Sequence, residues 1–349
     1  MINLLILPGD GIGPEIIKQV IKIIKSCIYI GYKINLIYNY IGGISIDKFN
    51  YPITNNLLNI IKYVDSILLG CVGGYKWNNS IYKPEYGLLK LRKNFNFFIN
   101  IRPIKCPFKN IDMLIVRELN GGIYYGNPKG YSKQIINQIP TWYAYNTKIY
   151  NEQEIIKIAR ISFNLALNRK KKLCSIDKSN VLETFKLWKK TINYIHKFYN
   201  KVKLTHIYID YATIDLIKNF NKFDVIITSN LFGDILSDLC SLLTGSLGML
   251  PSISINNKSL SLFEPCHGSA PDIANKNIAN PIGALLSLVM MLEYVFNDYK
   301  ISNILYYSIY KVLSYGFCTI DMKKYIKNFK IISTDEFGDL VNHFFLIND

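Results

Sequence analysis

Apolar runs alternate with amphipathic stretches along this 349-residue chain. Short apolar runs at residues 2–7, 66–69 and 224–228 predict buried strands. Helical patterns follow the first and third runs, at residues 14–27 and 233–243, and a glycine-rich loop follows the second. Strands that alternate with helices in this way indicate an α/β protein with a largely parallel sheet.

Two further segments depart from this alternation. Residues 121–150 are rich in glycine, tyrosine and asparagine, which predicts a β-arm or hairpin that projects from its domain. Residues 281–292 are apolar and uncharged, but the stretch ends at Glu293 and is too short to cross a bilayer. We therefore expect a buried helix there and no membrane span. The N-terminus also lacks the features of an export signal.

Composition narrows the class of protein. Half of the residues are hydrophobic and 19% are charged, which excludes a disordered or collagen-like chain, and the length allows two domains. The seven cysteines are scattered and form no C-x-x-C pair. Such cysteines are typical of free thiols in a reducing compartment, so we expect a cytoplasmic protein without disulfides or zinc.

The net charge of +16 raises nucleic-acid binding as an alternative function. The chain uses lysine, isoleucine, asparagine and tyrosine heavily, and only five of its 41 basic residues are arginine. The densest basic run, residues 169–172, follows the helical pattern Glu152–Leu167, where cations interact favourably with the helix dipole. We therefore expect no nucleic-acid partner; strong, salt-dependent binding to RNA or DNA would favour the alternative.

Three of the five arginines, Arg92, Arg102 and Arg117, lie close together in the sequence. In a chain that otherwise uses lysine, clustered arginines indicate positions that need a planar, two-pronged donor for carboxylate or phosphate. Separate structural ion pairs are the alternative. The cluster favours a site for a small molecule with several negative charges.

Asp234 and Asp238 lie one turn apart on the same face of a predicted, largely buried helix. Like charges at this spacing destabilise a helix unless a cation lies between them, and oxygen ligands favour Mg²⁺ or Mn²⁺. Asp210, at the end of a strand-like run, is a candidate third ligand. The alternative is one capping and one surface aspartate.

Two residues are candidates for proton transfer. Lys178 follows a predicted strand, and a lysine beside a metal and carboxylate-binding arginines is available as a base because its ammonium form is disfavoured. Tyr124 follows a glycine pair and is a candidate proton donor. Taken alone, each is more simply a solvated lysine and one of 26 tyrosines.

Two glycine-containing segments bear on cofactor binding. The turn at residues 9–13 has the spacing G-x-G-x-G rather than G-x-G-x-x-G, so it is a weak dinucleotide signature and is explained by a tight turn before Pro14. Residues 264–273 form a predicted loop with many turn formers and backbone donors. Such a loop can wrap an adenosine, with Asp272 accepting from both ribose hydroxyls. A carboxylate there favours NAD over NADP.

Taken together, these motifs resemble the β-decarboxylating dehydrogenases, the family of isocitrate and isopropylmalate dehydrogenases. The resemblance covers essentially the whole chain. Its most specific parts are residues 8–15, 73–77, 84–92, 116–119, 229–238, 268–280 and 333–336.

The resemblance implies an isopropylmalate dehydrogenase-like fold, with two α/β domains around a central cleft and without Rossmann topology. Residues 1–98 and 246–349 would form a first, NAD-binding domain. Residues 99–245 would form a second domain with the substrate and metal site, the dimer interface and a β-arm near residues 121–150. The enzyme would be a homodimer in which Lys178 and Asp210 reach into the partner's site.

The resemblance also implies roles for individual residues. Tyr124 and Lys178 would be catalytic, and Asp210, Asp234 and Asp238 would bind Mg²⁺ or Mn²⁺. The substrate would contact Glu85, Leu88, Leu89, Arg92, Arg102, Arg117, Val181 and Asp210. NAD would contact Gly74, Glu85, Glu264, His267, Gly268, Ser269, Ala270, Pro271, Asp272, Ile273 and Asn280.

The implied reaction is the metal-dependent oxidative decarboxylation of a 2-hydroxy dicarboxylate with NAD. Leu88, Leu89 and Val181 offer an apolar wall that suits an isopropyl group, worth about 1–3 kcal/mol when buried. A third carboxylate, as in isocitrate, would be unpaired there and would cost more. We therefore expect 3-isopropylmalate, an intermediate of leucine biosynthesis, as substrate; homoisocitrate, tartrate and malate are the alternatives within this class.

Three positions depart from the family pattern. Tyr75 replaces a common proline beside the expected nicotinamide loop, and Cys266 is an unusual but small residue in the nucleotide loop. Asn275 replaces an expected glycine, and asparagine tolerates left-handed backbone geometry. None of the three removes a catalytic group, so we expect an active enzyme.

Overall fold

The computed structural model describes residues 1–258, 260–323 and 330–347. The chain divides into two compact units. Unit 1 comprises Met1–Phe97, Arg102–Cys106 and Ser241–Asp349, and unit 2 comprises Phe98–Ile101 and Pro107–Cys240. Both chain ends thus belong to unit 1. These bounds differ from the expected ones because strand β4 (Ile99–Cys106) is divided, and its second half, with Arg102, belongs to unit 1.

The sheet of unit 1 has the strand order β2-β1-β3-β12-β11. Strand β1 (Ile2–Gly9) pairs in parallel with β2 (Ile34–Tyr38) and β3 (Ser66–Cys71). Strand β12 (Ser261–Pro265) is parallel to β3 but antiparallel to β11 (Pro251–Ile255). Every residue of β3 is buried, which explains its continuous apolar sequence. The order and the antiparallel pair confirm the expectation of a non-Rossmann sheet.

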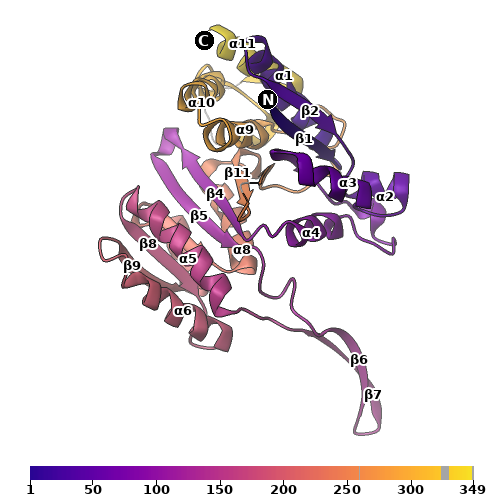
Figure 1. Ribbon diagram of the computed structural model, residues 1–349, viewed down its shortest axis with the longest axis vertical. Coiled ribbons are helices and arrows are strands. Elements are labelled where there is room, and N and C mark those ends of the chain that lie inside the picture. Colours follow the sequence, from indigo (N-terminus) through magenta and orange to yellow (C-terminus); the bar gives the residue numbers. More distant parts are fainter. Residues whose placement is uncertain (259, 324–329, 348–349) are drawn as a thin grey trace. The chain divides into compact units, whose positions relative to one another are not determined.

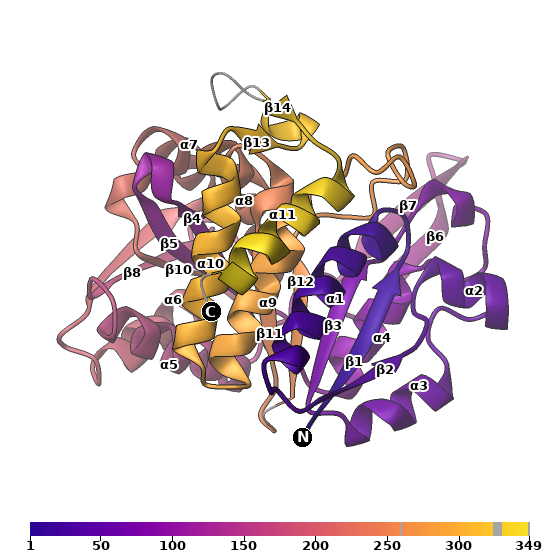
Figure 2. The ribbon, with the colours of Figure 1, turned by 90° about the horizontal axis from the view of Figure 1, so that it is seen from above.

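Helices cover the sheet of unit 1. Helices α1 (Gly13–Tyr29) and α9 (Ile282–Tyr294) contact its strands, while α10 (Tyr299–Ser314) and α11 (Thr334–Ile347) pack on those helices (Figure 2). Residues 282–292 of α9 are all buried, because the helix lies between the sheet and α10. Unit 1 also contains α2 (Gly43–Phe49), α3 (Asn55–Ile60), α4 (Glu85–Asn94) and the paired strands β13 (Phe317–Cys318) and β14 (Lys330–Ile331).

Unit 2 has a parallel sheet in which β5 (Ile111–Glu118), β10 (Val225–Thr228), β8 (Lys172–Asp177) and β9 (Lys203–Tyr208) follow one another. Its helices are α5 (Glu152–Leu167), α6 (Glu183–His196), α7 (Ile209–Lys218) and α8 (Asn230–Thr244), whose last residues belong to unit 1. Strands β8, β9 and β10 each lead directly to a helix, whereas β5 leads to a hairpin. Because the four strands are parallel, side chains at their carboxyl ends meet at one edge.

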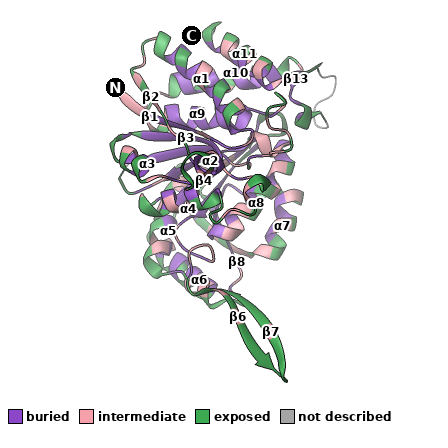
Figure 3. Ribbon diagram, turned by 90° about the vertical axis from the view of Figure 1, so that its right-hand side faces the viewer, coloured by how far each residue is buried: buried purple, intermediate pink, exposed green. Residues whose placement is uncertain are grey.

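A long antiparallel hairpin extends from the rest of unit 2 (Figure 1). It consists of β6 (Lys129–Ile136) and β7 (Ile139–Asn146), joined by Asn137 and Gln138, both with positive φ. Two central residues with positive φ match the twist of the strands they join. Figure 3 shows the hairpin exposed over almost its whole length.

The elements predicted from the hydrophobic pattern are confirmed. The three predicted strands are β1, β3 and β10, the predicted helices correspond to α1, α5, α8 and α9, and the predicted arm is the β6–β7 hairpin. Within the described part of the chain, no helix is both long and apolar enough to cross a membrane.

Candidate active site

Arg117 anchors a polar cluster in unit 2. It lies near the end of β5, and its neighbour on β10, Thr228, is followed two residues later by the start of α8. The guanidinium is buried and donates through Nε and Nη2 to Oδ1 of Asn230, at 3.1 and 2.8 Å, and through Nη1 to the carboxylate of Asp234. Gly233 permits this packing, because a Cβ there would lie 2.6 Å from Cγ of Arg117.

Tyr124 shares the carboxylate of Asp234 with Arg117. Its hydroxyl donates to Oδ2 of Asp234 at 3.3 Å. The Asp234 side chain remains 38% exposed, and Asp238 is exposed one turn further along α8. The structure therefore brings together three predicted site residues, Arg117, Tyr124 and Asp234, beside a second carboxylate that is open to solvent.

Lys178 and Asp210 form a second predicted group in unit 2. Lys178 follows β8, and Asp210 lies in the first turn of α7, directly after the neighbouring strand β9. Their Nζ and Oδ1 atoms lie 2.6 Å apart, and this contact with Lys178 holds the pKa of Asp210 below its ordinary value. The two residues thus form a pre-assembled pair.

The carboxylates suit a hard cation but do not complete its coordination. Asp234 and Asp238 offer oxygen ligands one turn apart, which fits Mg²⁺ or Mn²⁺. The described residues contain no group of three histidine, cysteine, aspartate or glutamate side chains that could hold a metal ion. Among these residues, Asp210 therefore does not form such a group with Asp234 and Asp238.

A buried hydrogen-bond network lies behind Arg117. The carboxylate of Glu118 accepts from the backbone amides of Asn120, at 2.6 Å, and Gly121, at 2.9 Å. Burial raises the pKa of Glu118 to about 7, although these amides oppose the shift. Tyr150 bonds Glu118 through its hydroxyl, which also accepts from the backbone amide of Asn230 at 3.0 Å.

This network connects the segment before Tyr124 to the first residue of α8. Glu118, Tyr150 and Asn230 were not among the site residues predicted from the sequence. The available signal was a charged residue directly after Arg117 in a strand whose residues are otherwise almost all buried.

Unit 1 holds the other two arginines. Arg92, in the last turn of α4, forms an ion pair with Glu264 on β12, and both side chains are buried. The Nε of Arg92 is buried without a hydrogen-bond partner among the described residues, which leaves a donor for a ligand. Arg102 is buried on β4. On α4, Leu88 and Leu89 are half-buried, whereas Glu85 is exposed; Val181, in unit 2, is also exposed.

Asp10 fixes the loops around the expected nicotinamide site, a role that the sequence analysis missed. Its buried carboxylate accepts from the backbone amides of Gly43 and Ile44, both at 2.7 Å, and Gly73, at 2.9 Å. Burial raises the pKa of Asp10 despite these donors. Beyond Gly73, Gly74 has a φ of 145° and Tyr75 is exposed.

The segment at residues 268–280, here called the 268–280 loop, packs directly on the glycine turn. The amide of Ile12 donates to the carbonyl of Ser269 at 2.8 Å, and a Cβ on Gly11 would lie only 1.9 Å from that oxygen. This approach, together with a φ of +56° at Gly11, explains the glycine without a dinucleotide signature.

The 268–280 loop has features that fit an adenosine. Asp272 is exposed, and Gly268 has open space around its Cα. Burial lowers the pKa of the neighbouring His267, which favours the neutral ring. Asn275 has a φ of +61°, the left-handed geometry expected for its replacement of glycine. Asn280 lies just before α9, and its Oδ1 accepts from the amide of Ile282, the first residue of that helix, at 3.0 Å.

The remaining assigned residues follow the same segment. Cys266 is half-buried, with its Sγ 3.3 Å from the carbonyl of Pro251, so it fits without disturbing the loop. Ser269 is buried, and Ala270 has a φ of +39°. Pro271 and Ile273 are half-buried beside the exposed Asp272.

Comparisons with known proteins agree with this geometry. A family model described as isocitrate/isopropylmalate dehydrogenase matches residues 3–341. The 3-isopropylmalate dehydrogenase of Buchnera aphidicola subsp. Pemphigus spyrothecae is 47% identical, with 97% of each chain covered. That of Prochlorococcus marinus subsp. pastoris is 43% identical, with 97% of this chain and 98% of the relative covered.

Solved structures lead to the same family. The crystal structure of isocitrate dehydrogenase from Methylococcus capsulatus superposes with a TM-score of 0.85 at 27% identity, covering 99% of each chain. A β-decarboxylating dehydrogenase from Thermococcus kodakarensis gives a TM-score of 0.79 at 29% identity, covering 99% of this chain and 97% of the other. The fold and family predicted from the motifs are confirmed: the chain belongs to the isocitrate/isopropylmalate dehydrogenase family.

Proposed function

We propose that this chain catalyses the oxidative decarboxylation of 3-isopropylmalate with NAD, giving 4-methyl-2-oxopentanoate, CO₂ and NADH in leucine biosynthesis. The observation that carries the proposal is the cluster in which Arg117 and Tyr124 share the carboxylate of Asp234. It combines a carboxylate-binding cation, an ionisable hydroxyl and a metal-type ligand. The relatives named 3-isopropylmalate dehydrogenase, which align along nearly the whole chain, support the choice of reaction.

Arginines bind the two carboxylates of the malate moiety in this proposal. Arg117 is held by Asn230 and Asp234, so its guanidinium is oriented before substrate arrives. Arg92 is held by Glu264 and keeps its Nε without a partner among the described residues. Fixed, two-pronged donors suit carboxylates better than flexible lysines do. Arg102 is assigned to the same role.

Proton transfer falls to two residues of this chain. Lys178 is assigned as the base that accepts the proton of the substrate hydroxyl, and its contact with Asp210 fixes the position of Nζ. After CO₂ leaves, Tyr124 donates its phenolic proton to the carbon that lost the carboxylate. NAD held by unit 1 would supply the hydride acceptor for the hydroxyl-bearing carbon, and Mg²⁺ or Mn²⁺ held by Asp234 and Asp238 would supply positive charge for the substrate's oxygens.

Substrate choice is assigned to apolar side chains. Leu88 and Leu89 are half-buried on α4 and carry no polar atom for a third carboxylate, and Val181 is a further apolar residue for the same group. Glu85, exposed at the start of α4, is assigned to both substrate and NAD. These residues favour an isopropyl group over the charged substituents of isocitrate and homoisocitrate, the hydroxyl of tartrate and the hydrogen of malate, which buries no apolar group.

The cofactor and assembly complete the proposal. NAD is assigned to unit 1, to Gly74, Glu264 and the 268–280 loop, with Asp272 on the ribose. The working form is a homodimer, in which Asp210 and Lys178 of one chain complete the metal and substrate site of the other. None of the seven cysteines forms a disulfide, which is compatible with the cytoplasm.

The purified chain tests the proposal through the absorbance of NADH. We expect turnover of 3-isopropylmalate with NAD and Mg²⁺, abolished by EDTA and restored by excess Mg²⁺ or Mn²⁺, and much weaker turnover with NADP. Release of CO₂ should match NADH mole for mole. Folded protein without turnover would contradict the assigned activity, and turnover insensitive to EDTA would contradict the metal assignment.

A further inference from the structure

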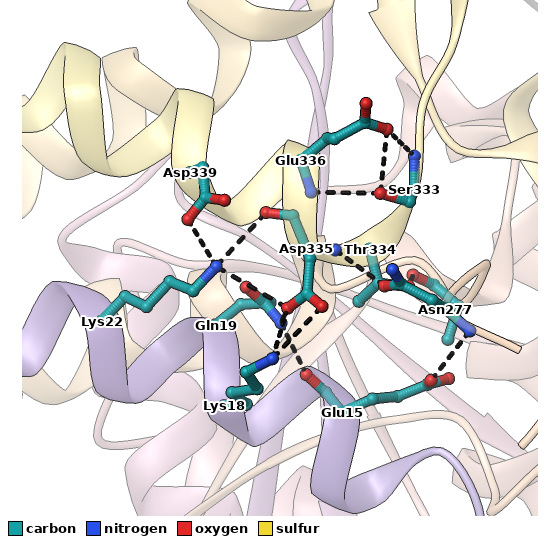
Figure 4. A network of polar contacts seen from close by, with 11 residues as sticks. Glu15, Lys18, Gln19, Lys22, Asn277, Ser333, Thr334, Asp335, Glu336 and Asp339 are labelled. Atoms are coloured by element: carbon teal, nitrogen blue, oxygen red, sulfur yellow. Dashed lines mark hydrogen bonds and ion pairs between the residues drawn. The ribbon is translucent and has the colours of Figure 1, made fainter. Parts of the chain in front are cut away.

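Asn277, near the end of the 268–280 loop, is held from two sides (Figure 4). Its backbone amide donates to Oε2 of Glu15 on α1 at 3.2 Å. Its carbonyl accepts from the amide of Thr334 at 2.9 Å, and its side-chain Oδ1 accepts from the amide of Asp335 at 3.0 Å. Three of the four polar groups of this one residue are therefore engaged by α1 and by the first turn of α11.

The contact satisfies the free amides at the start of α11. Ser333 caps this helix together with Glu336: the Glu336 carboxylate accepts from the amide and hydroxyl of Ser333, and the amide of Glu336 donates to Oγ of Ser333. The amides of Thr334 and Asp335 remain, and Asn277 accepts from both. The hydroxyl of Thr334 also donates to the carbonyl of Ala279 at 2.6 Å.

The conformation of this part of the loop requires outside support. Asn275 and Asn277 have φ values of +61° and +56°, and the left-handed region carries a conformational cost for every non-glycine residue, although a smaller one for asparagine. The contacts of Asn277 with Glu15 and α11 oppose that cost. Without these contacts, we expect the stretch between the exposed Asp272 and the buried Asn280 to leave its single backbone conformation.

A second layer fixes the side chains behind Asn277. Asp335 accepts from Nε2 of Gln19 at 2.7 Å and pairs with Lys18 at 3.0 Å, so the start of α11 is tied to α1. Lys22 pairs with Asp339 one turn further along α11, and its Nζ also donates to the carbonyl of Asp335 at 3.3 Å (Figure 4). Asp335 therefore joins Asn277 to α1, whereas Asp339 takes part in the link through Lys22.

We propose that Asn277 is a positioning residue for the adenosine half of the cofactor. Its hydrogen bonds with Glu15 and with the first turn of α11 hold the 268–280 loop in the conformation that binds the cofactor. This inference rests on the proposed assignment of NAD to that loop. It extends the site to the C-terminal helix, which carries none of the assigned binding residues.

The coupling acts in both directions. A ligand that orders the loop also strengthens its contacts with α11, by thermodynamic linkage. Binding of the adenosine half should therefore slow amide hydrogen exchange at Thr334 and Asp335. The amides of the β6–β7 hairpin, which belongs to unit 2, provide an internal reference.

Calorimetric titration with ADP-ribose, which contains the adenosine diphosphate of NAD but lacks the nicotinamide, tests the proposal. We expect Asn277→Ala to weaken ADP-ribose about tenfold, or roughly 1.4 kcal/mol, because it removes the acceptor of the Asp335 amide and disfavours positive φ. Asn277→Gly keeps the backbone conformation and should fall between wild type and Asn277→Ala. The matched control, Asp339→Asn, removes the ion pair with Lys22 and should bind like wild type.

Separate outcomes distinguish this proposal from the proposed function. If wild type binds ADP-ribose and turns over substrate, but Asn277→Ala binds ADP-ribose equally well, the positioning role is wrong and the function stands. Unchanged exchange at Thr334 and Asp335 in saturated wild type would also overturn it. Wild-type protein that is folded but binds neither ADP-ribose nor NAD would overturn both. The kinetic signature expected for Asn277→Ala is a raised KM for NAD with an unchanged KM for the organic substrate.

Discussion

At the scale of single residues, the guanidinium of Arg117 is held by two chemically different partners. Asn230 accepts from Nε and Nη2 inside the protein, and Asp234 accepts from Nη1 at the edge of solvent. The neutral partner can hold the arginine when the charged one is altered. A metal ion that binds the carboxylate of Asp234 would therefore leave the orientation of the Arg117 guanidinium unchanged.

Replacement of Asp234 by asparagine tests whether Asn230 holds Arg117 while Asp234 binds the metal ion. We expect Asp234→Asn to weaken Mg²⁺ at least about tenfold, because a charged ligand becomes neutral, and to lower turnover at subsaturating metal. The fold should persist because Arg117 keeps Asn230. Calorimetric Mg²⁺ titration measures the effect, and Asp112→Asn, which alters an outlying pair with Arg169, is the control. Equal Mg²⁺ affinity in all three proteins would refute the assignment of Asp234.

Glu118 gives a prediction about pH and stability. Burial raises its pKa in the folded protein from 4.5 to about 7, so the folded state binds the proton more tightly than the unfolded state. The stabilisation is fully present below about pH 4.5 and is lost as pH rises through about 7. The free energy of unfolding should fall by about 3 kcal/mol over this range through Glu118 alone.

Glu118→Gln isolates that contribution, since asparagine- and glutamine-type amides do not titrate. We expect urea unfolding of wild type to lose more stability between about pH 5 and pH 8 than unfolding of the variant, with the difference close to the contribution of Glu118. Asp10 and Glu15 also have raised pKa values, but they titrate in both proteins and cancel. Parallel pH profiles would show that Glu118 is ionised throughout.

At the scale of elements, the β6–β7 hairpin presents apolar side chains that its own unit does not cover. Tyr131, Ile135 and Trp142 lie on one face of the hairpin and are 78, 78 and 67% exposed. Exposed apolar groups of this size mark interaction surfaces. A second copy of the chain is the occupant required by the proposed homodimer.

Charge on this face should weaken the dimer without affecting the fold. We expect Trp142→Lys to raise the dimer dissociation constant at least about 100-fold, because an aromatic side chain that the dimer would bury is replaced by a charged one. Gln134→Lys, on the opposite face of the hairpin, is the control and should remain dimeric. Analytical ultracentrifugation measures both. A monomeric wild type, or a fully dimeric Trp142→Lys, would contradict the role of this face.

Elements with clear periodicity were predictable, whereas contacts made through backbone groups were not. The runs in β1, β3 and β10 and the apolar helix α9 follow from their sequences, since burial on both sides requires continuous apolar residues. Asp10 and Asn277 act on amides of segments distant in sequence. No spacing rule connects an aspartate at position 10 with amides at positions 43 and 73, so these roles require the tertiary structure.

At the scale of the whole molecule, the family could be identified from the sequence because its motifs are long and occur in order. The division of the chain was harder to place. Strand β4 is shared, so Arg102–Cys106 belongs to unit 1 although the surrounding residues belong to unit 2. A strand divided between two units has the same apolar pattern as a strand within one, and composition does not reveal such a boundary.

The central claim is that this chain acts on 3-isopropylmalate, and the specificity ratio tests it most directly. We predict a kcat/KM for 3-isopropylmalate at least about 100-fold above that for isocitrate, homoisocitrate, tartrate or malate, with NAD and saturating Mg²⁺, because Leu88 and Leu89 favour an isopropyl group and oppose a third carboxylate. An equal or higher kcat/KM for any of those acids would contradict the substrate assignment.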